Sequence, residues 1–461
     1  MQRAASVSAK QIYKPLVWVG GAFGIAGVFW FAQQARNRRA ASAATRLERS
    51  SSVRSVVPAE TAPPIKQKVD VSEFQLPLEY ESGAHFDWRV APYSNESLMS
   101  QTVTAATYNE LKDEKTSQAG WTLKQAMRPG VELPSTKIGL YAGDADSYWR
   151  FQAVFFPIIR ACQHGYDPLT REHRSDMNES KIFHQLKDEK LAEYLLSIRM
   201  RAARNISGLN LVPAQTKQQL EEVESIAKNC FKKFPAGTYT SYSQIEEGET
   251  SSLLEARVLF PKDDPFLKTT GAGKTWPTGR GVFRTTDDSL ICWVGEEDSM
   301  KLISMERGTD FAGAFARLVR GIKLLEIGLQ EQNKNFEFDK NLGYINTCPA
   351  NLGTGLRVSV HLKLPILSKQ PTFEKACGIL GLEVRRFESD PGVVEVSNKF
   401  QLGYTEVELV NTVIRGVENL ILMEEDFAAK PVGEHDVGQL QSFPLCHILP
   451  VCVHNTLCVC V

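Results

Sequence analysis

A cysteine, a glycine-rich turn and a cationic strand follow one another between residues 341 and 365. Cys348 precedes a turn that contains Asn351, Gly353 and Gly355, and glycines permit the tight backbone whose amide groups can surround an anion. Apolar side chains then alternate with polar ones, which predicts a strand whose polar face carries Arg357, Ser359, His361 and Lys363. Because phosphate sites need backbone donors and fixed guanidinium charge, the stretch favours an anion site over a merely solvated strand face.

Two further clusters could contribute charge to such a site. Arg199 and Arg201 are two residues apart, so they project to one face of a predicted strand, and Arg204 follows shortly after. Residues 295–298, Gly-Glu-Glu-Asp, form a predicted tight turn between two alternating strands. Taken alone, the arginines could belong to a surface strand and the carboxylates to a solvated turn.

Together these stretches resemble the phosphagen kinases, the ATP:guanido phosphotransferases that include arginine kinase and creatine kinase. The family signature Cys-Pro-Ser/Thr-Asn-Leu-Gly-Thr, followed by an Arg and a His, is matched by residues 348–354 except at Ala350, and by Arg357 and His361. The resemblance covers roughly residues 75–428. It implies reversible transfer of the γ-phosphoryl group of ATP to a guanidino small molecule, most simply an arginine-like one, with ATP/ADP and Mg²⁺ as cofactors.

The resemblance also implies roles for individual residues. Glu297 would pair with the guanidinium and orient or deprotonate its attacking nitrogen, while Glu296 would act through Mg²⁺-bound water or its field. The catalytic set is Glu297, Cys348, Glu296 and Glu388, the last as the candidate glutamate of a flexible lid. The nucleotide-binding set is Arg199, Arg201, Lys301, Arg357, Arg385, His361 and Asn351. The substrate-binding set is Thr136, Lys137, Ile138 and Tyr141, from a loop that closes on the substrate in arginine kinase. No side chains are predicted as direct metal ligands.

Several positions depart from the family pattern. Lys301 and Gln401 stand for arginines, Ile198 stands for a serine, and the lid is several residues shorter. Ala350 lacks a hydroxyl that could hydrogen-bond the thiolate, so the pKa of Cys348 is expected to be raised. A catalytically degenerate subunit with a structural role in a mitochondrial membrane complex is therefore the alternative to an active kinase.

The patterns and the resemblance predict an α+β fold. Residues 74–186 are expected to form a small all-helical domain, with helical segments at 96–112 and 144–163. Residues 187–430 are expected to form a larger domain with a mainly antiparallel sheet flanked by helices. Helical periodicity predicts those helices at 215–235, 309–330 and 405–427.

The residues before the folded part predict a membrane anchor. Residues 1–15 form a basic segment without acidic residues, as in mitochondrial targeting sequences, and residues 16–35 are predicted as one transmembrane helix. A cleaved secretory signal fits less well, because basic residues follow the apolar run. Residues 36–73 are typical of a flexible linker. We therefore expect a single-pass protein of the mitochondrial inner membrane, with a membrane protein complex as a candidate partner.

Composition and cysteine spacing set further limits. A formal net charge of −1 predicts no nucleic-acid binding, and scattered cysteines indicate a reducing compartment. Residues 431–461 are predicted to be an irregular Cys-rich tail, since their cysteines and histidines fit no zinc-site spacing.

Overall fold

The structure, a computed structural model, describes residues 78–79, 85–86, 96–183, 189–387 and 389–429. Outside the described residues lie the predicted basic segment 1–15, transmembrane helix 16–35, linker 36–73 and tail 431–461, and the candidate lid residue Glu388. Within the part of the chain that is described, no helix is long and apolar enough to cross a membrane. The expectations for those segments therefore stay predictions.

The N-terminal part of the described chain is helical, as predicted, apart from two short strands. Its elements are β1 (Leu78–Glu79), β2 (His85–Phe86), α2 (Leu98–Thr102), α3 (Ala105–Leu111), α4 (Leu123–Glu132), α5 (Asp146–Arg150) and α6 (Gln152–Cys162). The helical segments predicted at 96–112 and 144–163 are each divided into two helices. Thr104 is extended and caps α3, and Phe151 leaves the helical conformation between α5 and α6. A residue outside the helical region interrupts the hydrogen-bond ladder, so one periodic stretch becomes two helices.

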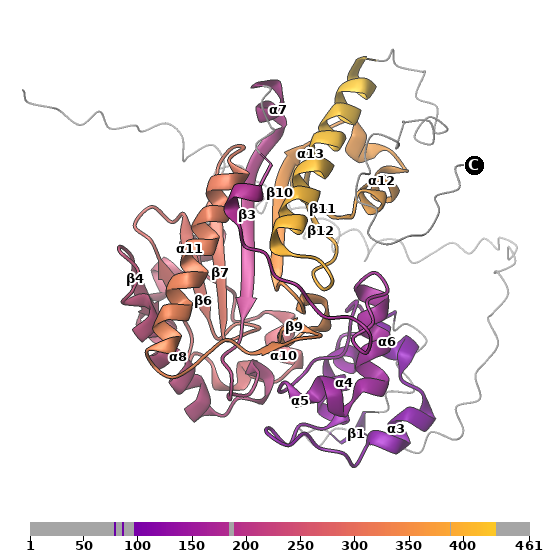
Figure 1. Cartoon of the computed structure of the whole chain (residues 1–461), viewed down its shortest axis with the longest axis vertical. Coiled ribbons are helices and arrows are strands. Elements are labelled where there is room, and N and C mark those ends of the chain that lie inside the picture. Colours follow the sequence, from indigo (N-terminus) through magenta and orange to yellow (C-terminus); the bar gives the residue numbers. More distant parts are fainter. Residues whose placement is uncertain (1–77, 80–84, 87–95, 184–188, 388, 430–461) are drawn as a thin grey trace, which may run out of the picture. The chain divides into compact units, whose positions relative to one another are not determined.

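An eight-stranded sheet, in the order β11-β12-β10-β3-β7-β6-β5-β4, forms the larger part. Its strands are β3 (Leu195–Arg204), β4 (Thr238–Ser241), β5 (Gly281–Arg284), β6 (Leu290–Val294), β7 (Met300–Glu306), β10 (Leu356–Lys363), β11 (Leu382–Arg386) and β12 (Val393–Asn398). Every neighbouring pair is antiparallel, which confirms the predicted sheet type. Figure 1 shows β3 beside β10, two strands that are far apart in the sequence.

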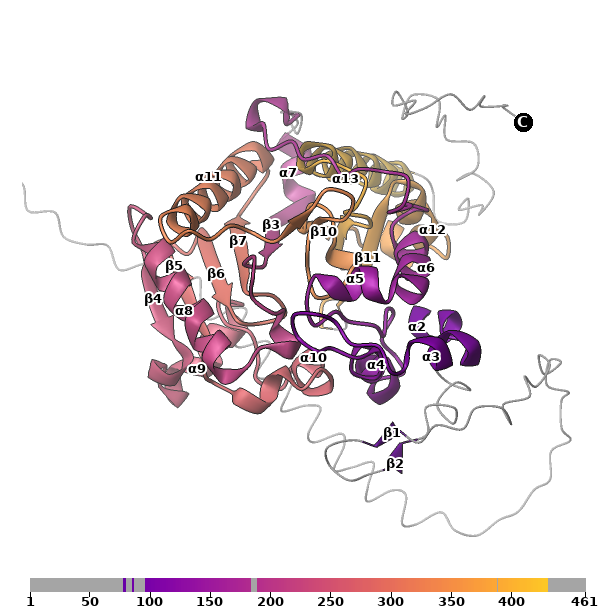
Figure 2. The same ribbon diagram turned by 60° about the horizontal axis from the view of Figure 1, so that its bottom comes forward.

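Three long helices cover one face of this sheet. They are α8 (Lys217–Phe231), α11 (Phe311–Gln330) and α13 (Glu406–Ala429), which confirms the helices predicted from periodicity. Figures 1 and 2 show α11 and α13 over the same face. Their apolar stripes pack against alternate strand residues such as Met200 and Val358, both fully buried. On the opposite face, β3 and β10 carry polar side chains, whereas β5, β6 and β7 carry apolar ones that pack in a separate cluster with residues 258–260.

The helical part shares its core with the larger part. Leu342, Ile345, Cys348, Leu352 and Leu402 pack in the same apolar cluster as the helices between residues 98 and 162. The predicted division at residues 186 and 187 is therefore crossed by one core. The remaining α-helices and strands of the described residues are α7 (Glu189–Tyr194), α9 (Glu247–Glu255), α10 (Pro265–Thr269), α12 (Phe373–Ile379) and a hairpin of β8 (Phe338–Asp339) and β9 (Gly343–Tyr344).

Candidate active site

The polar face of the sheet gathers the predicted arginines. In the register of β3 and β10, Arg201 lies opposite Arg357, and Arg199 shares the face of Arg201 because it is two residues away. Arg385, exposed on the edge strand β11, lies opposite Glu395 of β12. Guanidinium groups thus converge on one face from three strands, as alternation predicts for β3 and β10 and as the resemblance implies for Arg385.

Buried nitrogens of this cluster lack hydrogen-bond partners among the described residues. They are Nε and Nη2 of Arg199 and the Nε atoms of Arg201 and Arg357. Burial lowers the pKa of Arg199 to about 10 and the pKa of Arg201 to about 9, and neighbouring guanidinium groups add to both effects. Because buried donors without acceptors are costly, this geometry favours an anionic ligand such as a phosphate chain.

Glu395 already neutralises part of the cluster. Its Oε1 accepts a hydrogen bond from Arg357 Nη2 at 2.9 Å, and its Oε2 lies 3.4 Å from Nε2 of His361. Nδ1 of His361 is 3.1 Å from the hydroxyl of Ser197. Burial by itself would raise the pKa of Glu395, but His361 and the surrounding arginines lower it to about 2. His361, predicted to bind nucleotide, thus contacts the counter-ion of Arg357.

The acidic turn between β6 and β7 lies beside the cysteine turn. Asp298 is fully buried, and its Oδ1 accepts hydrogen bonds from Asn205 Nδ2 and from the backbone N–H of Thr347, each at 2.8 Å. Thr347 in turn donates its hydroxyl to the backbone oxygen of Glu297 at 2.8 Å. These bonds hold Glu297 next to Cys348, the residue after Thr347.

Glu297 is half-buried and lies among charged groups. Lys301 Nζ forms an ion pair with Glu296 and lies 3.4 Å from Glu297 Oε2. Burial raises the pKa of Glu297, Lys301 opposes this, and Asp298 and Glu296 reinforce it, so that the pKa lies at about 7. A carboxyl group with a pKa near neutral pH suits proton transfer. Lys301 therefore offsets part of the negative charge of the acidic turn.

Cys348 is buried at the start of the short turn Pro349–Asn351. Burial raises the pKa of the thiol well above its ordinary value, and the carboxylate of Glu297 raises it further. The direction agrees with the prediction, but burial is the main cause rather than the missing hydroxyl at position 350. Asn351 Nδ2 lies 3.4 Å from Glu297 Oε2. Glu297, Cys348 and Asn351 are therefore brought together.

The loop predicted to bind substrate is fixed mainly by its backbone. The carbonyl oxygens of Lys137 and Ile138 accept hydrogen bonds from the first residues of α2, each at 2.9 Å. The side chain of Ile138 is buried in the helical core, so the structure does not bring it to the site. Lys137, in contrast, is largely exposed, and its Nζ forms an ion pair with Glu383 of β11. Lys137 thus links the loop to the strand that carries Arg385.

Thr136 and Tyr141 line a cavity of about 260 Å³ together with Asp264 at the start of α10. Burial raises the pKa of Tyr141, and the fields of Cys348 and Glu297 add to this rise. Burial also raises the pKa of Asp264. The loop therefore borders the catalytic residues through Tyr141.

Arg204, the third arginine of its strand, braces the glycine turn. Its Nη1 donates to Ala203 O at 2.7 Å and to Thr354 O at 2.8 Å, and its guanidinium carbon lies 3.5 Å from the centre of the Tyr344 ring.

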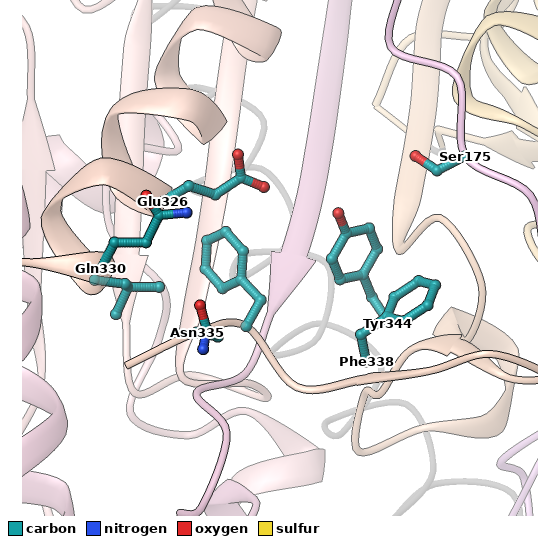
Figure 3. A pocket seen from close by; sticks show the side chains of 8 residues that line it. Ser175, Glu326, Gln330, Asn335, Phe338 and Tyr344 are labelled. Carbon is teal, nitrogen blue, oxygen red and sulfur yellow. The ribbon is translucent and has the colours of Figure 1, made fainter. Parts of the chain in front are cut away.

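A cavity of about 350 Å³ lies near this ring, on the side of α11. Glu326 and Gln330 face Tyr344 and Phe338 across it (Figure 3). None of the predicted site residues lines this cavity, so it is separate from the site.

Sequence reasoning missed residues that position the site. Asn205 holds Asp298, Glu383 holds Lys137, and Gln163 hydrogen-bonds the cysteine turn. Asn205 gave a weak signal, because it is a polar residue directly after a predicted strand. Gln163 lies at the end of an apolar helical run, where its side-chain partners have no signature in the sequence.

Comparison with known proteins identifies two family domains. Residues 93–160 match the N-terminal domain of ATP:guanido phosphotransferases, and residues 218–427 match their C-terminal catalytic domain. The chain is 34% identical over 346 residues to the arginine kinase of Anthopleura japonica, which covers 73% of this chain and 47% of that protein. The chain therefore spans about half the length of this curated relative.

Solved structures of guanidino kinases are also similar to this chain. A lombricine kinase superimposes with a TM-score of 0.69 at 30% identity, covering 76% of this chain and 97% of the other. The duplicated taurocyamine kinase from Schistosoma mansoni, with bound transition-state-analogue components, has a TM-score of 0.69 at 28% identity, covering 75% of this chain and 49% of the other.

Proposed function

Because this chain belongs to the ATP:guanido phosphotransferase family, we propose that it reversibly transfers the γ-phosphoryl group of ATP to a guanidine nitrogen. The strongest support comes from the buried guanidinium nitrogens of Arg199, Arg201 and Arg357, which lack partners among the described residues. Lys301, opposite Ala203 in the register of β3 and β7, connects this face to the acidic turn. Phosphoryl transfer to a guanidinium needs an anion site and a carboxylate site side by side.

The arginines would bind and neutralise the phosphates of the nucleotide. Arg199, Arg201, Arg357 and Arg385 can supply charge-assisted hydrogen bonds, which are stronger than neutral ones. Mg²⁺ bound with the nucleotide would supply further positive charge. Glu296 fits an indirect contact to this ion, since its Oε2 already accepts from the backbone N–H of Glu297 at 2.7 Å and pairs with Lys301.

Glu297 and Cys348 would bind the guanidinium. Glu297 would take a proton from the attacking nitrogen as the nitrogen–phosphorus bond forms and the bond between the γ-phosphorus and the ADP oxygen breaks. The Cys348 sulfur, as a thiolate, would pair with the same cation. A bound guanidinium lowers the pKa of both groups, because an opposite charge favours their ionised forms.

We propose that the substrate is arginine-like. Support comes from the 34% identity to an arginine kinase and from the carboxyl group of Asp264, which lines the cavity beside Tyr141 and could receive an α-ammonium group. The names of the structural relatives make lombricine and taurocyamine the competing substrates.

ADP formation by the full-length chain tests this function. With MgATP, we expect turnover that depends on arginine in a panel with lombricine, taurocyamine, creatine and glycocyamine. Glu297→Gln and Cys348→Ala should each reduce it by about 10²-fold or more. Cys377→Ala, which removes a buried free cysteine in α12, is the control and should retain turnover. Folded protein without turnover on any guanidine would contradict the proposal and favour a catalytically degenerate structural subunit.

We further propose that residues 16–35 anchor the protein in the mitochondrial inner membrane. The proposal rests on the uncharged run from Leu16 to Ala32 and on the basic segment before it. Phe23→Arg with Ile25→Arg should release the chain from mitochondrial membranes into an alkaline carbonate extract. Two arginines placed in the linker, at positions 43 and 44, are the control and should leave it in the membrane pellet. Release of the wild-type chain into the carbonate extract would contradict the proposed membrane anchor.

A further inference from the structure

Lys301 places a positive charge of the chain itself against the acidic turn. It lies on β7, four residues after Glu297, and its side chain is only 12% exposed. Its Nζ forms an ion pair with Glu296 and lies 3.4 Å from Glu297 Oε2. The carboxylate that is assigned to the substrate guanidinium therefore already faces a cation.

The contact between Lys301 and Glu297 is a loose one. At 3.4 Å it is longer than the roughly 2.7–2.9 Å of a strong charge-assisted hydrogen bond. Asn351 Nδ2 lies at the same distance from the same oxygen. Glu296, in contrast, is fixed in the turn, because its Oε2 also accepts from the backbone N–H of Glu297 at 2.7 Å. Lys301 is therefore held mainly by Glu296.

A substrate guanidinium would meet Lys301 at Glu297. Both cations would lie against one carboxyl group in a half-buried turn, where solvent screens their repulsion only in part. The attraction of Glu297 for the substrate is therefore reduced for as long as the ammonium group stays beside it. Guanidine binding gains if Lys301 moves away from this oxygen.

The polar face of the sheet offers Lys301 another position. Lys301 lies opposite Ala203 of β3, and Arg201 is two residues from Ala203 on the same face. Ala203 carries only a methyl group, so it leaves the space beside the long, flexible lysine side chain open. On the other side, Trp293 of β6 lies opposite Lys301, and the guanidinium carbon of Arg199 is 5.3 Å from the centre of the Trp293 ring. An anion bound by these arginines would lie beside Lys301.

We propose that Lys301 competes with the guanidino substrate for Glu297 until the phosphates of the nucleotide draw it away. The inference rests on the proposed function, because it assumes that phosphates bind the arginines and that a guanidinium binds Glu297. Bound nucleotide then strengthens guanidine binding, and a bound guanidine strengthens nucleotide binding by the same factor, since such coupling is reciprocal.

Calorimetric titration of arginine into the full-length protein, with and without MgADP, tests the proposal. MgADP is used because it cannot phosphorylate arginine. For the wild type, we expect MgADP to tighten arginine binding by about tenfold. Lys301→Met removes the ammonium group but keeps a long side chain. We expect it to bind arginine about tenfold more tightly than the wild type without nucleotide, and MgADP to change that affinity by less than about twofold.

The titrations are run at about pH 9. Lys301 lowers the pKa of Glu297, so its removal raises this pKa above the value of about 7 in the wild type, and Glu296 and Asp298 add to the rise. At neutral pH a proton on Glu297 would then replace Lys301 as the competitor of the guanidinium. At about pH 9 this competition is reduced, and the guanidinium of arginine stays charged.

Three further variants complete the test. Lys301→Arg keeps a cation at this position, so the effect of MgADP should remain. Lys340→Met removes an exposed lysine that pairs with Glu172 away from the site, and it should leave both affinities unchanged. If Lys301→Met does not fold, Lys301→Gln takes its place, because it removes the charge and keeps a hydrogen-bond donor for Glu296. The sign separates competition from a structural role, since loss of a merely structural residue would weaken arginine binding.

The outcomes distinguish this proposal from the proposed function. Arginine binding by folded Lys301→Met that is unchanged or weaker without nucleotide would overturn the role of Lys301, as would a wild type that shows no effect of MgADP. Either result in a protein that still turns over arginine would leave the proposed function intact. The expected shifts in a protein without turnover would support the role of Lys301 and contradict phosphoryl transfer. Failure of the wild type to bind any guanidine of the panel would overturn both.

Discussion

If Glu297 is the base, as the proposed function assigns it, its protonation sets the pH range of the site. Glu297 lies among two other carboxyl groups and one ammonium group in a half-buried turn, and its pKa is raised to about 7. A base must be ionised before it can accept a proton. The free enzyme is therefore expected to gain activity as the pH rises through this value.

The pH profile of kcat/KM checks this expectation. For the wild type, kcat/KM should rise between about pH 6 and about pH 8 with an apparent pKa near neutrality, because this parameter reports ionisation in the free enzyme. Glu297→Gln should remove the rise together with most of the activity. Glu255→Gln, at the exposed end of α9, is the control and should keep the wild-type profile. A wild-type profile that falls over this range would contradict the assigned role.

The same carboxyl group also affects stability. Its pKa of about 7 exceeds the ordinary value of 4.5, so Glu297 contributes stability below pH 4.5 that is lost as the pH rises through about 7. The free energy of unfolding of Glu297→Gln, measured in urea relative to wild type, should therefore increase from pH 5 to pH 8. A constant difference would show that the pKa is not raised in the folded state.

At the scale of elements, β3 and β10 hold guanidinium groups, several of whose buried nitrogens have no hydrogen-bond partner among the described residues. Arg201 illustrates the conflict between stability and binding, because it is half-buried and its buried Nε lacks a partner among the described residues. Alternation along β3 and β10 places such residues on one face. The other face carries the apolar residues that pack against the helices, so the arginines cannot lie there.

Arg201→Met should therefore stabilise the ligand-free protein while weakening nucleotide binding. We expect a gain of about 1–4 kcal/mol in the free energy of unfolding, since a desolvated charge is removed. We expect a loss of about 10–100-fold in ATP affinity, since charge-assisted hydrogen bonds are lost. Arg317→Met is the control, because Arg317 pairs with Glu306 outside the site, and it should destabilise the fold without changing ATP affinity. Destabilisation by Arg201→Met would contradict this account of the sheet face.

Replacement of Glu395, on the same face of the sheet, should destabilise the protein rather than stabilise it. Its pKa is about 2, below the ordinary 4.5, so its contribution to stability is present above pH 4.5 and is lost as the pH falls through about 2. Glu395→Gln should lower the free energy of unfolding by about 3 kcal/mol at pH 7, and the difference should shrink below pH 4.5. Glu374→Gln removes an exposed partner of Arg386 and should have little effect at any pH.

At the scale of the whole molecule, the helical part and the sheet are expected to unfold together. Tyr148 donates its hydroxyl to Asn346 O at 2.5 Å, and the core of the helical part includes Cys348 and Leu402. Hydrogen exchange in urea should therefore give amides of α6 and β10 the same opening free energy and the same dependence on denaturant. Exchange of α6 at a clearly lower free energy would show that the helical part opens independently.

The sequence predicted those features that depend on periodicity and motif. Alternation located β3, β10 and their arginines, and helical spacing located α8, α11 and α13. Contacts between distant segments could not be predicted, because they depend on three-dimensional packing. The ion pair of Lys137 with Glu383 and the bonds of Gln163 join residues more than a hundred positions apart.

Phosphorus NMR of the reaction mixture tests the central claim most directly, because it separates transfer from hydrolysis. Full-length protein with MgATP and arginine should produce an N-phosphoryl resonance together with ADP. Addition of ADP to the isolated phosphorylated product should regenerate ATP, whereas Glu297→Gln should do neither. Folded wild-type protein that releases only inorganic phosphate, or that leaves ATP unchanged with every guanidine, would contradict the assignment of this site to reversible phosphoryl transfer.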